Sequence, residues 1–324
     1  MTNRVSIEIL ERMTMALDES TDTLLKNIAS QGGPALNEMP VDTCRGVFVG
    51  LVQTLQGDLL PIHDSDDREI SGPNGKIPLR VYTPRGLAGK KIPVLMLFHG
   101  GGWVIGDLET HDNMCRYYAN EADVIVVAVD YRLAPENPFP AGIEDCIAAT
   151  KWAHSNAASF GGDNSKIAVT GDSAGGNMAA VVAQQLRDKV AFQLLMYPAT
   201  DFSATNYASR EKFGGGEYFL SSADMMWFGK LLFGDSNPAG DAKASPIEAD
   251  NLAGLPPALT ITAGFDPLRD EGKAYADALG AAGVASEYKC YEGTIHGFLS
   301  FPGALEAGAD GLRFAAERLK AALS

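Results

Sequence analysis

A serine flanked by glycines is the strongest chemical signal in this sequence. Residues 171–175 read Gly-Asp-Ser-Ala-Gly, with Ser173 in the middle. A strand-like apolar run precedes the motif at 166–171, and a helical segment follows it at 175–186. In such a strand-to-helix turn the flanking glycines avoid a steric clash, and the serine hydroxyl is exposed at the sheet edge. The motif predicts that Ser173 is a nucleophile; a plain glycine-rich turn is the alternative.

A second glycine-rich motif predicts where the charge on a reacting carbonyl oxygen is stabilised. Residues 99–103 read His-Gly-Gly-Gly-Trp and follow an apolar run directly. Amides aimed at a developing oxyanion supply much of the catalysis in acyl transfer. We expect the N–H groups of Gly101, Gly102 and Ala174 to form this oxyanion hole, and His99 to brace the loop. A phosphate-binding loop is the alternative, but it needs a Gly-Lys-Ser or Gly-Lys-Thr sequence, which the motif lacks.

A serine nucleophile needs a general base and an acid that orients the base. Only one histidine, His296, follows Ser173 in the sequence. Because serine, acid and histidine follow one another in this order in proteins with such a motif, His296 is predicted to be the base. Asp266 follows the strand-like run at 258–264, whereas Asp270 falls within the next helix. The position at the end of a strand favours Asp266 as the acid, with Asp270 as the alternative.

The elements that must position these residues alternate along the chain. From residue 93 onward, short apolar runs are separated by helical segments, which is typical of a parallel sheet covered on both faces. The strand-like runs are 94–98, 124–129, 166–171, 192–198, 258–264 and 285–291. Before them we expect helices at 6–19 and 41–55, and a hairpin at 68–84 that turns on Pro73-Asn74-Gly75.

The alternation is interrupted once, between about residues 203 and 243. The stretch at 211–234 is bulky and helical in pattern, without a strand-like run. Because ligands of open α/β sheets bind at the carboxyl edge of the strands, we expect 1–55 and 203–243 to form a helical cap over that edge. Residues 56–202 and 244–324 then form the catalytic domain. The alternative is that both segments are extra helices on the core.

Taken together, five motifs resemble the bacterial hormone-sensitive-lipase-like esterases of the GDSAG branch. They are HGGGW at 99–103, DYRLAPE at 130–136, GDSAGGN at 171–177, DPLRDEG at 266–272 and HGF at 296–298. The resemblance extends from about residue 80 to 300 and implies an α/β-hydrolase fold, with a mostly parallel central sheet, flanking helices and a helical cap. It implies a serine carboxylesterase for short- to medium-chain acyl esters, with Asp266 as the acid. A homodimer through an edge strand is a further expectation from the family.

Composition narrows the classes of function. The 324 residues contain 26 Lys and Arg against 41 Asp and Glu, a net charge of −15, and such a surface repels nucleic acids and anionic membranes. No apolar run approaches the roughly 18 to 20 residues that span a bilayer, and the first residues lack the pattern of a signal peptide. Four scattered cysteines suit a reduced, cytoplasmic protein. We expect a cytoplasmic enzyme for a small-molecule ester, with no metal or cofactor.

Three side chains are predicted to line the substrate pocket. Trp103 lies next to the predicted oxyanion loop, and Met226 and Trp227 lie in the bulky inserted segment. Aromatic rings and flexible methionines suit an adaptable apolar surface, although packing in the core is the alternative for each of them.

Several charged residues near the motifs are interpreted as structural. Arg132 and Glu136 are predicted to form an ion pair. Asp107, Glu109 and His111 could suggest a metal site, but polar residues that open a helix are more often a solvated cap.

A protein without catalysis is the main competing class of function. Plant gibberellin receptors resemble the same family but lose the histidine of the triad, whereas this chain keeps Ser173, Asp266 and His296. An enzyme is therefore expected. Lactones, carbamates and amides undergo the same chemistry as esters and stay open as substrates.

Overall fold

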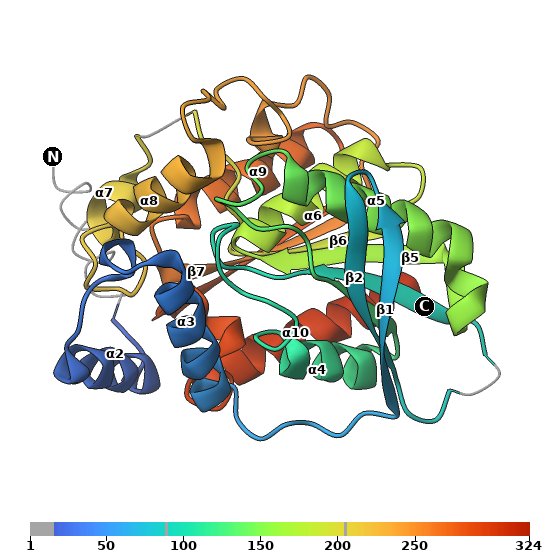
Figure 1. Ribbon diagram of the computed structural model, residues 1–324, viewed down its shortest axis with the longest axis horizontal. Coiled ribbons are helices and arrows are strands. Elements are labelled where there is room, and N and C mark those ends of the chain that lie inside the picture. Colours follow the sequence, from blue (N-terminus) through green and yellow to red (C-terminus); the bar gives the residue numbers. More distant parts are fainter. Residues whose placement is uncertain (1–15, 88–89, 204–205) are drawn as a thin grey trace, which may run out of the picture.

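The computed structural model describes residues 16–87, 90–203 and 206–324, in which helices cover both faces of one sheet (Figure 1). The predicted helix at 6–19 lies largely outside the described residues. Its last part was predicted wrongly, because residues 16–18 are not helical and the first described helix, α2, begins at Glu19.

The sheet has eight strands in the described part of the chain, in the order β1-β2-β4-β3-β5-β6-β7-β8. The six strands from β3 to β8 run parallel, and β2 pairs antiparallel with both β1 and β4. The strands are β1 (Asp64–Gly72), β2 (Gly75–Thr83), β3 (Ile92–Phe98), β4 (Ile125–Val129), β5 (Gly162–Asp172), β6 (Phe192–Met196), β7 (Ala258–Phe265) and β8 (Ser286–Ile295). All six predicted apolar runs are therefore parallel strands, and the predicted α/β-hydrolase fold is confirmed.

The predicted hairpin is confirmed as β1 and β2. Gly72 pairs with Gly75, which leaves Pro73 and Asn74 as a two-residue turn. Gly75 has a φ of 140°, a value that residues with a side chain rarely adopt.

The helices form two layers around the sheet. Figure 1 shows α4 and α10 against one face and α5, α6 and α9 against the other. The described helices are α2 (Glu19–Gln31), α3 (Val41–Leu55), α4 (Asp112–Ala122), α5 (Ala141–Asn156), α6 (Ala174–Gln185), α7 (Ala208–Phe213), α8 (Ser222–Phe233), α9 (Arg269–Ala281) and α10 (Glu306–Leu323). Short 3₁₀ turns are η1 (Leu36–Glu38), η2 (Ala157–Phe160), η3 (Pro246–Glu248) and η4 (Phe298–Ser300).

Alternation along β3 divides the core into two clusters. Leu95 and Leu97 pack on the side of α4 and α10, whereas Val94, Met96 and Phe98 pack on the side of α5, α6 and α9. Successive side chains of a strand point to opposite faces, so a continuous apolar run supplies both cores at once.

The remaining helices gather at one end of the sheet. Figure 1 shows α2, α3, α7 and α8 together there. The predicted helix at 41–55 is confirmed as α3. The helical character predicted for 211–234 is confirmed in part, by the end of α7 and by α8, whereas residues 214–221 between them form turns. The backbone N–H of Asn37 donates to Asp224 Oδ1 at 3.2 Å, so the N-terminal and inserted segments contact each other. No helix within the described ranges has the length and apolar character needed to cross a membrane.

The predicted ion pair between Arg132 and Glu136 is wrong. Arg132 Nε donates to Asp145 Oδ2 of α5 at 2.8 Å, and Glu136 pairs with Arg45 of α3 at 2.8 Å. The two residues lie in a loop rather than a helix, so a spacing of four does not bring their side chains together. The pair between Arg45 and Glu136 instead ties α3 to the loop between β4 and α5.

Candidate active site

Ser173 lies on the predicted strand-to-helix turn between β5 and α6. Its φ of 55° and ψ of −116° are unusual for a residue with a side chain. A Cβ at Gly171 would lie 2.3 Å from the backbone of Gly175, and a Cβ at Gly175 would lie 1.9 Å from the carbonyl oxygen of Phe98. Both positions therefore require glycine, and the tight turn raises the serine side chain at the carboxyl edge of the sheet.

Three residues from three strand ends form one hydrogen-bonded chain. Ser173 Oγ lies 2.9 Å from His296 Nε2, and His296 Nδ1 lies 2.8 Å from Asp266 Oδ2. Asp266 is fully buried after β7, and its Oδ1 accepts the N–H of Leu268 at 2.8 Å. A carboxylate accepts the proton on Nδ1, so the lone pair of Nε2 faces the serine hydroxyl, as a general base requires.

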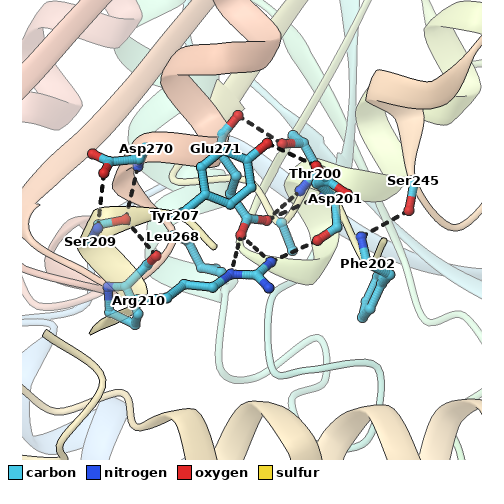
Figure 2. Close-up of polar contacts among 12 residues, drawn as sticks. Thr200, Asp201, Phe202, Tyr207, Ser209, Arg210, Ser245, Leu268, Asp270 and Glu271 are labelled. Carbon is cyan, nitrogen blue, oxygen red and sulfur yellow. Dashed lines mark hydrogen bonds and ion pairs between the residues drawn. The ribbon is translucent and has the colours of Figure 1, made fainter. Parts of the chain in front are cut away.

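Asp270, the alternative acid, points elsewhere. Figure 2 shows it beside Ser209 of α7, whose backbone N–H donates to Asp270 Oδ2 at 2.9 Å. Arg269 also donates to Asp270 Oδ1 at 2.8 Å. Of the two aspartates considered from the sequence, Asp266 is the one in contact with His296.

The predicted oxyanion loop lies beside the serine. Gly101 and Gly102 have positive φ values of 116° and 58°. A Cβ on Gly101 would lie 2.2 Å from the carbonyl oxygen of Ile105, and a Cβ on Gly102 would lie 2.4 Å from the ring of Phe228. Among the residues that the structure describes, the N–H groups of Gly101, Gly102 and Ala174 donate to no protein acceptor. Three free amides are thus available for a substrate oxygen.

A buried network behind this loop was not predicted. Asp172 Oδ1 accepts the N–H of Gly100 at 2.8 Å and lies 2.8 Å from His111 Nε2. Burial acts to raise the pKa of Asp172, but the contacts with His111 and with the Gly100 N–H outweigh it and lower that pKa. The solvated cap predicted for His111 is wrong, because this side chain is buried. No pattern in the sequence indicated that these two residues pair, because they lie 61 positions apart in the chain.

His99 braces the loop, as its place before the glycines suggests. Its ring stacks on Tyr131 at 4.2 Å between centroids, and its Nδ1 lies 2.8 Å from the carbonyl oxygen of Gly100. Burial lowers the pKa of His99 to about 4, which keeps the ring neutral at neutral pH.

A cavity of about 1180 Å³ lies over the serine. Ser173, His296, Gly101 and Gly102 border it on one side, and residues of α2, α3 and α8 border it on the other. Of the predicted pocket residues, Trp103 and Met226 line this cavity. Trp227 is not among the described lining residues; it packs on Phe228 at 5.0 Å between ring centroids. Neighbours on one helix cannot all face the same side, which explains the difference.

Comparisons with known proteins agree with this architecture. A family model described as alpha/beta hydrolase fold matches residues 95–300. Carboxylic ester hydrolase LipN of Mycobacterium tuberculosis is 48% identical over 73% of this chain and 65% of its own length. Carboxylesterase NlhH of the same species is 43% identical over 79% of this chain and 83% of its own. The structure of ester-hydrolase EH1AB1 from the metagenome of Lake Arreo superposes with a TM-score of 0.91 at 44% identity, covering 94% of this chain and 98% of that one.

These matches establish the class of the protein. The chain belongs to this α/β-hydrolase family, in its hormone-sensitive-lipase-like branch. It is a carboxylic-ester hydrolase.

Proposed function

We propose that the protein is a serine carboxylesterase that hydrolyses short- to medium-chain acyl esters through an acyl-enzyme intermediate. The observation that carries the proposal is the hydrogen-bonded chain from Ser173 through His296 to Asp266, beside three free backbone amides. A nucleophile, a base, an orienting acid and oxyanion donors are the groups that acyl transfer requires.

The reaction proceeds in two similar halves. His296 takes the proton of Ser173 while the serine oxygen attacks the ester carbonyl, and Asp266 stabilises the imidazolium that forms. The amides of the oxyanion hole hold the negative oxygen of the tetrahedral intermediate. His296 then gives the proton to the leaving alcohol, which departs and leaves the acyl group on Ser173. In the second half, water attacks the acyl-enzyme in the same way and releases the acid.

The preference for short and medium acyl chains is supported by the aromatic part of the cavity lining rather than by the total volume of about 1180 Å³. Phe219 and Phe301 line the cavity beside Gly297, which follows His296. Burial of each methylene against such apolar side chains adds about 0.8 kcal/mol of favourable transfer, and the gain ends where the acyl chain passes them. The net charge of −15 also opposes adsorption to anionic lipid surfaces.

We further infer that 1–55 and 203–243 act as a helical cap, because α2, α3 and α8 line the cavity opposite Ser173.

A cytoplasmic location is inferred from the four cysteines, which are all free thiols. A homodimer through an edge strand, β1 or β8, stays a prediction that light scattering of the purified protein tests.

A covalent label tests the proposed function directly. The protein is treated with a 4-nitrophenyl alkylphosphonate, which leaves a phosphonyl group on an activated serine. Hydrolysis of 4-nitrophenyl butyrate should disappear in proportion to labelling, and peptide mass spectrometry should find the label on Ser173. Full labelling of Ser173 with activity retained, or labelling of another residue, contradicts the proposal. A parallel panel with a lactone, a carbamate and an anilide ranks the substrate classes.

A further inference from the structure

A buried carboxylate next to the active site joins three segments of the chain. Glu271 lies in the first turn of α9, and its side chain is 1% exposed. Its Oε1 accepts the backbone N–H of Thr200 at 2.8 Å and that of Asp201 at 3.4 Å. Its Oε2 accepts from Arg210 of α7, whose Nε lies at 3.0 Å. Figure 2 shows this carboxylate between the guanidinium on one side and the two backbone amides on the other.

The same helix α7 holds the start of α9 through a second set of contacts. Ser209 Oγ donates to the carbonyl oxygen of Pro267 at 2.8 Å, and the Ser209 N–H donates to Asp270 Oδ2 (Figure 2). Arg210 Nη2 also donates to the carbonyl oxygen of Asp201 at 2.7 Å. The inserted segment is therefore fixed to both the loop after β6 and the turn between β7 and α9.

Both of those connections carry parts of the active site. The turn after β7 holds Asp266, whose Oδ1 accepts the N–H of Leu268. The loop after β6 contains Ala199, whose N–H donates to the carbonyl oxygen of Ser173 at 3.3 Å. Ala199 and Leu268 pack together with Leu220 in one apolar cluster, and all three line the cavity. A shift of Glu271 would move the acid of the triad and the cavity wall together.

We propose that Glu271, held by Arg210, is a positioning residue that keeps the Asp266 turn and the cavity wall aligned with Ser173. The inference rests on the proposed function and extends it to residues outside the triad. Neither side chain transfers a proton or touches the reacting atoms. The pair acts by fixing three segments that separate strands deliver to the same edge of the sheet.

The carboxylate must be ionised for this role. Burial raises the pKa of Glu271 to about 7, although Arg210 and the backbone N–H groups favour the charged form. The other charged and titratable groups around the pair are Asp201, Tyr207, whose hydroxyl donates to Asp201 Oδ2, and Asp270. A protonated Glu271 loses its negative charge and carries an O–H among groups that only donate, the guanidinium and the two backbone N–H groups, so these contacts are weakened. Activity should therefore fall as Glu271 gains its proton.

The first measurement compares two buried pairs of the same chemistry. In E271Q one oxygen becomes an N–H₂, which meets a donor whether it faces Arg210 or the backbone N–H of Thr200, and the neutral amide imitates the protonated form without changing the shape. The control is D145N, which breaks the buried pair of Arg132 and Asp145, with side chains 24% and 2% exposed and outside the described cavity lining. D145N should lower the melting temperature without lowering kcat. Only E271Q should lower kcat for 4-nitrophenyl butyrate, by about 10- to 100-fold, since small misplacements of catalytic groups carry such costs.

The pH profile separates positioning from a general loss of stability. A histidine base alone gives an acidic limb of log kcat/KM with a slope of about 1, whereas protonation of Glu271, which lowers activity by about 10- to 100-fold, makes the limb steeper than 1 over about one to two pH units. The wild type should show the steeper limb and E271Q the shallower one. In R210M the carboxylate loses its cation, which raises its pKa, so the steep limb should move to higher pH.

The outcomes distinguish this inference from the proposed function. A wild type that does not hydrolyse 4-nitrophenyl butyrate or any other ester of the panel overturns both. An active wild type, together with an E271Q variant of unchanged kcat and unchanged slope, overturns the positioning role alone. If E271Q does not fold, R210M is judged by its own two criteria, a lower kcat and a limb at higher pH. Failure of both criteria in R210M also overturns the inference.

Discussion

The cavity over Ser173 has two sides that are built differently. One is the sheet edge, where the strands end at Ser173 and His296, and the other is the helical wall, formed by residues of α2, α3 and α8. At the sheet edge, Ser173, His296 and Asp266 follow separate strands, and their polar atoms are linked to one another. On the helical wall the lining is largely apolar and partly open to solvent: Met226 of α8 is 70% exposed and Val47 of α3 is 46% exposed.

This difference separates two kinds of function. Buried, directional hydrogen bonds hold catalytic groups in one geometry, and loss of such a group removes several kcal/mol of transition-state stabilisation. Apolar contacts on an exposed wall are worth about 0.8 kcal/mol per buried methylene and have no fixed direction. Changes at the sheet edge should therefore abolish catalysis, whereas changes on the helical wall should only alter which acyl chain is preferred.

The largest effect is expected for the nucleophile. Ser173→Ala should reduce kcat for 4-nitrophenyl butyrate by roughly 10⁶, as expected when a serine nucleophile is removed. Circular dichroism should show an intact fold. Near-normal turnover by a folded variant would place the nucleophile elsewhere, and the sheet edge would lose its assigned role.

The two neighbouring aspartates provide the next test. Asp266→Asn should lower kcat by about 10⁴, because an amide cannot hold the imidazole in the correct tautomer. Asp270→Asn is the matched control: its side chain contacts Ser209 and Arg269 rather than His296, so its loss of kcat should be far smaller. Reversed losses would mean that Asp270 is the acid.

The sheet edge was predictable from the sequence because its chemistry is encoded locally. The glycines around Ser173 are set by clashes within a few residues, and the order of motifs left only His296 as the base. The parallel strands were equally clear, since a strand buried on both faces is apolar throughout.

The charged links between segments were not predictable. Arg210 pairs with Glu271 over 61 positions and Arg45 with Glu136 over 91, and no local pattern selects such partners. Nearness in sequence suggested Arg132 with Glu136, which the fold separates. One available cue was that Glu271 lies four residues before Tyr275 and eight before Leu279, on the buried face of α9. A charge on an apolar helix face implies a buried partner.

These two links should respond to pH in opposite ways. The hydrogen bonds from Arg45 lower the pKa of the exposed Glu136 to about 2, whereas burial raises that of Glu271 to about 7, from an ordinary value of 4.5 in both cases. The contribution of Glu271 to the free energy of unfolding is present below pH 4.5 and lost as the pH rises through about 7. That of Glu136 is present above pH 4.5 and lost as the pH falls toward 2.

Urea unfolding at a series of pH values measures this contrast. Between pH 4.5 and 7, the free energy of unfolding of E271Q should rise relative to that of the wild type by on the order of 3 kcal/mol. This is the free energy that corresponds to the shift in the pKa of Glu271 from 4.5 to about 7. E136Q should be slightly less stable than the wild type above pH 4.5, and this difference should vanish as the pH falls toward 2; it is small because the pair is exposed. Parallel curves for E271Q and the wild type would show that Glu271 is already ionised across this range, and its role in the acidic limb would be excluded.

The smallest effects should come from the helical wall. For 4-nitrophenyl esters below their micellar concentrations, kcat/KM should rise over the first few acyl carbons and stop rising by about eight, when the acyl chain passes the apolar lining next to the active site. Met226→Ala should shift this preference toward longer chains by a few-fold, because it removes apolar bulk from an exposed part of the lining. Leu59→Ala is the control, since Leu59 is similarly apolar, 57% exposed and outside the described cavity lining.

A maximum at palmitate, or a jump in rate when triolein forms an emulsion, would show that the wall opens onto lipid. The helical wall would then determine whether the enzyme acts on lipids at all. The view that this wall only selects among acyl chains, while the sheet edge alone determines the reaction, would be wrong.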